Sequence, residues 1–152
     1  MSDASFADGA ARALRLVAVD ADDLRVVSAL LQDAVTTADE MRWARGERRF
    51  AALLNRFRWE ARLDDPERVR AVLSVEGVTA VRSQGVPQDD TVLSLLSLAW
   101  EAGEDGAGRL LLTFAGDGVV AVEAEALDLQ LRDVTRPYRA VSGRAPEHPV
   151  DG

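Results

Sequence analysis

The sequence predicts an α+β domain, with a mostly antiparallel curled sheet or split barrel of about seven to eight strands and one N-terminal helix. Two observations indicate this class. One stretch, beginning near Asp20, repeats its apolar residues at helical spacing, whereas most later runs alternate with the two-residue period of a strand. In addition, Asp117–Gly118 lies between two apolar runs, which is typical of a hairpin turn.

The first two elements are a short strand and the helix. "LRLVAV", from Leu14, alternates as a strand does. The acidic run "DADD" then suits a helix start, because carboxylates accept bonds from free N–H groups and favour the positive end of the helix. An apolar stripe follows, which we expect to pack against the sheet: Leu24, Val27, Leu30 and Leu31.

A hairpin should come next, formed by "AVTTADEMRW" and "RRFAALLNRFRWEA" and joined by "ARGE". We expect Gly46 to supply the turn conformation that most residues avoid. The second run has two faces. We expect the core face to hold Ala51, Leu53, Asn55, Phe57 and Trp59, and the other face, which begins apolar and ends charged, to hold Phe50, Ala52, Leu54, Arg56, Arg58 and Glu60.

The remaining runs also indicate strands. "RVRAVLSV" places Val69, Ala71, Leu73 and Val75 on one face, and Gly77 predicts a bulge or sharp bend after it. We interpret "TVLSLLSLAWEAG" as a strand, and we extend β structure to about Val134. A two-residue turn at Asp117–Gly118 would set Ala115, Thr113 and Leu111 opposite Val120, Val122 and Ala124.

The chain should form one globular domain, residues 13–139, between disordered tails at residues 1–12 and 140–152. No apolar stretch approaches the ~18 to 20 residues that a membrane helix needs. The N-terminus is acidic and lacks the order of an export signal, so we expect the cytoplasm and no membrane association.

The composition excludes several chemistries. There is no cysteine, all 18 basic side chains are arginine, and the one histidine, His148, lies in the predicted C-terminal tail. Thiolate chemistry, lysine Schiff bases and lysine phosphate loops are therefore excluded, and histidine triads or multi-histidine metal sites are not expected. We predict no catalytic residue, no metal site and no cofactor.

An arginine-rich segment, "MRWARGERRFAALLNRFRWEARL" from Met41 to Leu63, is the most unusual feature. Its seven arginines and two glutamates give a local charge of +5 in a chain of net charge −8, leaving −13 elsewhere. On a strand, Arg56 and Arg58 would stand about 7 Å apart, a geometry that suits a carboxylate or phosphate. The candidate anion- or partner-binding residues are Arg56, Arg58, Arg49 and Trp59.

A structural role for these arginines is the alternative that we favour. The chain has 26 acidic residues, so intramolecular partners are abundant. We expect Arg56 or Arg58 to pair with an acidic residue of an adjacent strand. Candidate partners of the arginines are Glu60, Glu76, Glu101, Glu123 and Glu125.

Four stretches resemble a bacterial family catalogued only as domain of unknown function 2948: "LRLVAVDADDLRVVSALLQDAV", "ERRFAALLNRFRWE", "AVRSQGV" and "LSLLSLAWE". The likeness covers about Leu14 to Asp133, and "LQDAV" and "LNRFRWE" are its most specific pieces. The resemblance implies a small bacterial cytoplasmic protein of a family without an assigned activity, so it supplies no catalytic residues.

These observations predict a non-enzymatic binding or protein-interaction domain whose partner is an unknown protein or a small anion. The expected site, at the arginine pair, would bind a small anion or an acidic segment. The alternatives are an enzyme that uses carboxylate and arginine groups, and a structural homo-oligomer, such as a homodimer formed through edge strands. We do not expect nucleic-acid binding, because a net charge of −8 opposes a polyanion over a broad surface.

Overall fold

The computed structural model describes residues 13–60 and 67–139, so both predicted tails lie outside the described residues. The α+β class is confirmed. The described chain contains a ten-residue α-helix and an eleven-stranded, open antiparallel sheet. The strand number exceeds the predicted one partly because two strands, β2 (Val35–Thr36) and β11 (Tyr138–Arg139), are only two residues long. A strand of two residues is too short to show the apolar–polar alternation by which a sequence predicts strands.

The sheet order is β1-β10-β5-β4-β2-β7-β8-β9-β6, with β3 beside β4 and β11 beside β5. We call β1, β10, β5, β4 and β3 the first half, and β7, β8, β9 and β6 the second half. Their bounds are β1 (Arg15–Ala18), β3 (Met41–Ala44), β4 (Arg49–Phe57), β5 (Glu67–Glu76), β6 (Val78–Gln84), β7 (Leu93–Ala102), β8 (Gly108–Phe114), β9 (Val119–Ala124) and β10 (Leu129–Asp133).

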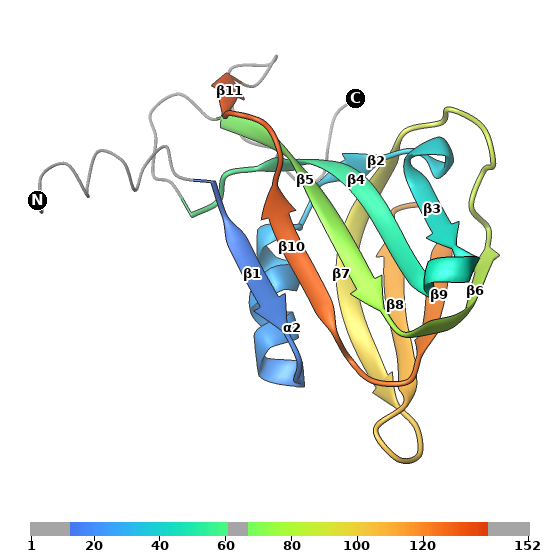
Figure 1. Ribbon diagram of the computed structural model, residues 1–152. Coiled ribbons are helices and arrows are strands. Elements are labelled where there is room, and N and C mark those ends of the chain that lie inside the picture. Colours follow the sequence, from blue (N-terminus) through green and yellow to red (C-terminus); the bar gives the residue numbers. More distant parts are fainter. Residues whose placement is uncertain (1–12, 61–66, 140–152) are drawn as a thin grey trace, which may run out of the picture.

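The core lies between the two halves. Figure 1 shows the first half in front and the second behind it, and β2 pairs with both β4 and β7 where the halves meet. The first half contributes Leu73, Val75, Leu129 and Leu131, and the second contributes Leu110, Leu112, Phe114 and Val122, all essentially inaccessible to solvent. The other faces of both halves are turned outward.

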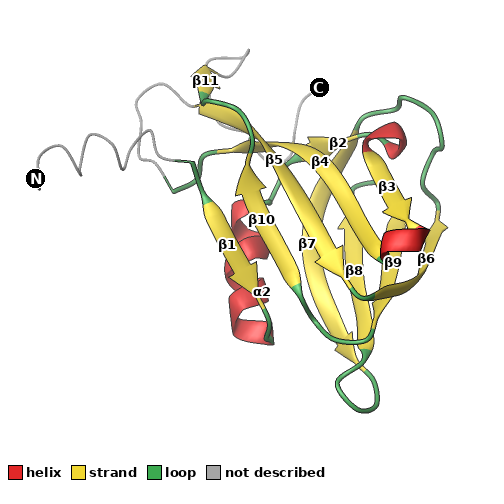
Figure 2. Ribbon diagram, viewed as in Figure 1, coloured by secondary structure: helices red, strands yellow, loops and turns green. Residues whose placement is uncertain are grey.

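The helix α2 (Ala21–Leu30) covers the core on the side of β1 and β7 (Figure 2). It begins as predicted, because the Asp20 side chain accepts a 2.8 Å hydrogen bond from the backbone N–H of Asp23. Leu24, Val27 and the following Leu31 are buried, which confirms the apolar stripe. No helix within the described ranges is long and apolar enough to cross a membrane.

The β3–β4 hairpin is confirmed, with Trp43 opposite Phe50. The prediction for Gly46 was wrong. Gly46 lies inside a 3-10 turn, η2 (Arg45–Glu47), and Arg48 takes the left-handed conformation with φ of 53°. The chain therefore turns by adding a helical turn, and the residue that ends this turn carries the unusual conformation.

The predicted core face of β4 was also wrong. Phe50, Ala52, Leu54 and Arg56 are buried, whereas the alternate residues at positions 51, 53 and 55 are only half-buried. Position 56 belongs to the inward face although it is charged. Carboxylates from elsewhere in the chain neutralise its guanidinium, so that an arginine can extend the apolar face.

Two further turns were predicted, one of them with the right geometry. Gly77, with φ of 69°, separates β5 from β6, and these strands pair with different neighbours, so the sharp bend is confirmed.

The predicted β8–β9 register was wrong. Thr113 lies opposite Val119, because the turn is wider than two residues and includes Gly116 at φ of 88° and Asp117 at φ of 71°. The buried face of β8 carries Leu110, Leu112 and Phe114, with Leu110 opposite Val122 and Leu112 opposite Val120.

Candidate functional site

The predicted arginine pair, Arg56 and Arg58, is buried, with exposed fractions of 0% and 5%. Arg56 is the fourth inward residue of β4, and Arg58 follows the end of that strand. Both side chains bond carboxylates near the end of β4: Glu60 follows that strand, Glu67 begins β5, and Asp133 ends β10. The pair thus lies beneath the surface, where bulk solvent has little access.

Every N–H donor of the Arg56 guanidinium has an acceptor. Nε and one terminal nitrogen bond the two Asp133 oxygens at 3.0 Å, and both terminal nitrogens bond Glu60 at 2.8 Å. The fifth bond, at 2.9 Å, goes to the carbonyl of Phe57. A guanidinium has five donors. An external anion could therefore bind Arg56 only by displacing Glu60 or Asp133.

These contacts hold the groups in their charged forms. Burial opposes ionisation of Arg56, but hydrogen bonds to Glu60 and Asp133 outweigh it and raise the pKa of Arg56. Burial also opposes ionisation of Glu60, and the hydrogen bonds and charge of Arg56 outweigh it and lower the pKa of Glu60. Asp133 additionally accepts a 2.8 Å bond from the N–H of Leu14, which ties β1 to the cluster.

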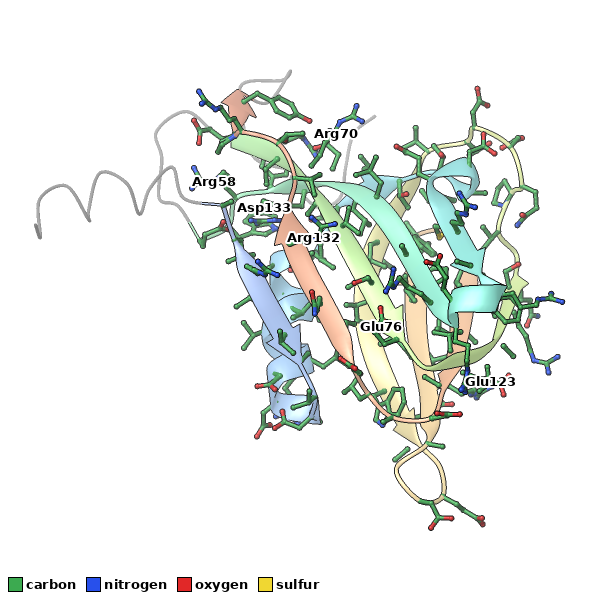
Figure 3. The ribbon with its side chains drawn as sticks, viewed as in Figure 1. Arg58, Arg70, Glu76, Glu123, Arg132 and Asp133 are labelled. Carbon is green, nitrogen blue, oxygen red and sulfur yellow. The ribbon has the colours of Figure 1, made fainter. Side chains whose placement is uncertain are left out.

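Arg58 forms an ion pair with Glu67 at 2.6 Å, and Glu67 begins β5, the neighbour of β4. The predicted pairing with an adjacent strand is confirmed. We call Arg56, Arg58, Glu60, Glu67 and Asp133 the buried ionic cluster, and Figure 3 labels Arg58 and Asp133 within it.

The other two candidates lie apart from each other. Arg49 is at the opposite end of β4, where it bonds Glu76 of β5 at 2.5 Å, and this contact is the main reason that the pKa of Arg49 is raised. Trp59 is 39% exposed and donates from its indole N–H to the carbonyl of Gln32 at 3.1 Å. The structure does not bring Arg49 to the arginine pair. Anion binding at any of the four remains a prediction.

The expected intramolecular partners do hold arginines. Glu76 pairs with Arg49, and Glu125 pairs with Arg48. In the second half, Glu101 pairs with Arg109, and Glu123 pairs with Arg82 at 2.9 Å. With Glu60 on Arg56, all five predicted carboxylates are used, so much of the arginine content serves the fold.

Three other arginines form a cluster on the outward face of the first half. Arg15 of β1 lies directly opposite Arg132 of β10, and Arg132 in turn lies opposite Val72 of β5. Arg70 is two residues before Val72 on that face. Directly opposed side chains have Cβ atoms about 5 Å apart and diagonal neighbours about 7–8 Å apart. We call Arg15, Arg70 and Arg132 the outer arginine cluster.

The outer arginine cluster is exposed and has no carboxylate partner among residues 13–60 and 67–139. In Figure 3, Arg70 and Arg132 lie toward the upper ends of β5 and β10, away from Glu76. Beyond Arg68, which precedes Arg70 by two residues, nearby positions on the same face are apolar or uncharged: Val17, Gln130, Ser74, Ala51, Leu53 and Asn55. The result is a positively charged area with a flat, mixed surface between the charges.

Sequence reasoning did not find this cluster. Its members lie in three separate runs, "LRLVAV", "RVRAV" and "LQLRDV", each at an outward position of an alternating strand. The alternation showed that each arginine would point outward. What brings them together is that β1, β10 and β5 are neighbours, although β10 follows β1 by more than 110 residues.

Comparison with known proteins gives one result. No curated protein and no solved structure matches this chain. No group of three or more metal-ligating side chains occurs in the part of the chain that the structure describes. A family model matches residues 14–148, so the chain belongs to the family described as "Protein of unknown function (DUF2948)".

Proposed function

We propose that this protein is a non-enzymatic interaction domain that binds an acidic, extended segment of a partner protein on the outer arginine cluster. The observation that carries the proposal is the direct opposition of Arg15 and Arg132 on adjacent strands, without a carboxylate partner among the described residues. Like charges placed directly opposite each other destabilise a sheet. An acidic ligand would relieve this repulsion, although the chain, with 26 acidic and 18 basic residues, leaves the two arginines without an acidic neighbour at their register positions.

The geometry of the cluster suits an extended acidic chain. Alternate side chains of an extended segment point the same way and repeat about every 6.8 Å. That repeat is close to the diagonal separation of about 7–8 Å expected between Arg70 and Arg132. Carboxylates at every second position would therefore each meet a guanidinium, and Arg15 would add a second donor group beside Arg132.

The surface favours a protein segment over nucleic acid. Single-stranded nucleic acids bind sheet faces largely by stacking bases on aromatic rings. The register positions beside Arg15 and Arg132 hold Val17, Val72, Ser74 and Gln130 and offer no ring, and beyond Arg70 there is one partly exposed ring, Tyr138, opposite Arg68. The net charge of −8 also opposes a long polyanion, whereas a short acidic segment meets only the basic area.

The buried ionic cluster supports the choice of surface. Because the donors of Arg56 are occupied by Glu60, Asp133 and the Phe57 carbonyl, a partner cannot reach them, whereas Arg15, Arg70 and Arg132 are exposed. The proposed partner is thus the acidic segment expected from the sequence, bound by different arginines.

The test measures fluorescence anisotropy of a short labelled peptide with glutamate at every second position. We expect salt-sensitive binding that a matched glutamine peptide lacks. A variant with Arg15, Arg70 and Arg132 all changed to Gln should bind about tenfold or more weakly, since three exposed contacts at about 0.5 kcal/mol each amount to one decade.

The matched control changes Arg82 and Arg109 of the second half to Gln, because each of these already pairs with a glutamate. Equal loss in both variants would overturn the proposed site. Labelled single-stranded RNA should bind no more tightly than non-specific contact, ~10⁻⁴ to 10⁻⁶ M. Submicromolar RNA binding that the triple variant abolishes would replace the protein segment with nucleic acid.

A further inference from the structure

A second, independent site lies where β3 and β6 approach each other. A pocket of about 140 Å³ opens there, and it is lined mainly by apolar side chains. Its volume is close to the ~150 Å³ of an engineered apolar cavity that holds benzene. The apolar lining includes Met41 and Trp43 from β3, Phe50 from β4, Val81 from β6 and Val120 from β9. Space of this size suits one small ring or a branched aliphatic group.

The pocket has a polar group without a partner. The indole nitrogen of Trp43 is screened from solvent and has no hydrogen-bond acceptor among the described residues. An unsatisfied buried N–H is unfavourable, because it has lost its hydrogen bond to water without gaining another. The guanidinium of Arg45 lies 4.5 Å from the centre of the Trp43 ring and covers one of its faces. The Trp43 ring is thus held in place beside the pocket by Arg45.

The pocket also has a positive charge. Arg42 lines it and is exposed, and it has no ion pair within residues 13–60 and 67–139. Two arginines farther along the hairpin differ in this respect, because Arg48 is paired with Glu125 and Arg49 with Glu76. An apolar lining beside a guanidinium without an ion pair is complementary to an apolar body that carries a single carboxylate.

We propose that this pocket binds a small monocarboxylate with an apolar body about the size of one six-membered ring. The body occupies the space between Phe50, Val81 and Val120. The carboxylate pairs with Arg42, and the body also contacts the ring of Trp43, which lies on the inward face of β3. This site shares no residue with the outer arginine cluster, so either proposal can fail without the other.

The probe is benzoate, and benzyl alcohol is its uncharged control. In ¹H–¹⁵N spectra of the labelled protein, benzoate should shift one tryptophan indole signal, assigned to Trp43 by its absence in Trp43→Phe. Arg42→Gln should weaken benzoate binding roughly five- to tenfold and leave the affinity for benzyl alcohol unchanged. Arg132→Gln, on the outer arginine cluster, should change neither affinity.

A pocket-filling variant tests the location without removing charge. Ser83 lines the pocket on the exposed strand β6, and Ser83→Phe should abolish binding of both probes while the spectrum elsewhere stays that of a folded protein. Absence of benzoate binding at high millimolar concentration would overturn the proposal. So would binding that shifts other signals but leaves the Trp43 indole unchanged, or binding that survives Ser83→Phe.

Discussion

The outward-facing arginines of the two halves of the sheet have opposite surroundings: acidic neighbours in the second half and other arginines in the first. In the second half, Arg109 lies between two acidic positions, Glu101 on β7 and Glu123 on β9, and it pairs with Glu101. In the first half, Arg15 lies against Arg132, and the next charge on that face is Arg70. One outer face is balanced within the fold, and the other is left positive.

The first half does not lack acidic residues, because its inward side carries several carboxylates. There, Asp133, Glu60 and Glu67 surround two guanidiniums, and Asp133 is adjacent in sequence to the exposed Arg132. The strand β10 thus places its carboxylate inward and its arginine outward. Alternation along one strand separates a structural charge from an accessible one.

The largest expected effect concerns the buried ionic cluster. Asp133→Ala removes two of the five bonds of the fully buried Arg56, and breaking a buried pair by deleting one partner typically costs about 3–5 kcal/mol. We expect a loss of about 3 kcal/mol or more in the free energy of unfolding, measured by urea denaturation followed by circular dichroism.

The control for this variant is Glu101→Ala, which breaks an exposed pair of the second half and should hardly change the urea midpoint. A double variant, Arg56→Met with Asp133→Leu, should recover much of the lost stability, because apolar residues can replace a buried pair. If Asp133→Ala unfolds at the parent midpoint, the cluster does not hold the first half together.

A smaller effect should appear as pH dependence. The folded-state pKa of Glu60 is lowered, because the hydrogen bonds and charge of Arg56 outweigh the opposing effect of burial. Its contribution to stability is therefore fully present above the ordinary glutamate pKa of about 4.3 and is lost as the pH falls through the lowered folded pKa. Thermal melts across this acidic window should show a weaker pH dependence for Glu60→Gln than for the parent protein. Identical pH profiles would contradict the assignment.

The smallest expected effect is a change in stability that has opposite signs when an outward arginine of each half is replaced by glutamate. Arg132→Glu converts the Arg15–Arg132 opposition into an opposite-charge pair and should stabilise the protein by about 0.2–1 kcal/mol. Arg109→Glu places a third acid beside Glu101 and Glu123 and should lower the melting temperature. Both shifts should shrink in high salt. Changes of the same sign in the two variants would mean that the outer faces do not differ as described.

Local patterns sufficed for several elements. The capped helix at Asp20 and the buried row from Val69 to Val75 depend on spacing and on side-chain chemistry within a few residues, and both are present. The β8–β9 register failed, because a turn that includes Gly116 and Asp117 in left-handed conformations shifts every pair along the two strands. Turn width depends on conformations that the Asp-Gly pair alone does not specify.

By itself, the sequence determined the α+β class, the alternation of each strand, the position of the helix and the absence of lysine and cysteine chemistry. Tertiary structure decided which arginines are accessible. Arg56 looked like a surface residue because charged side chains are rarely buried, and it is buried because Asp133, 77 residues away, reaches it. Arg15 and Arg132 become neighbours only when β1 pairs with β10. Strand order arises from long-range packing of a common core, which no short window of sequence contains.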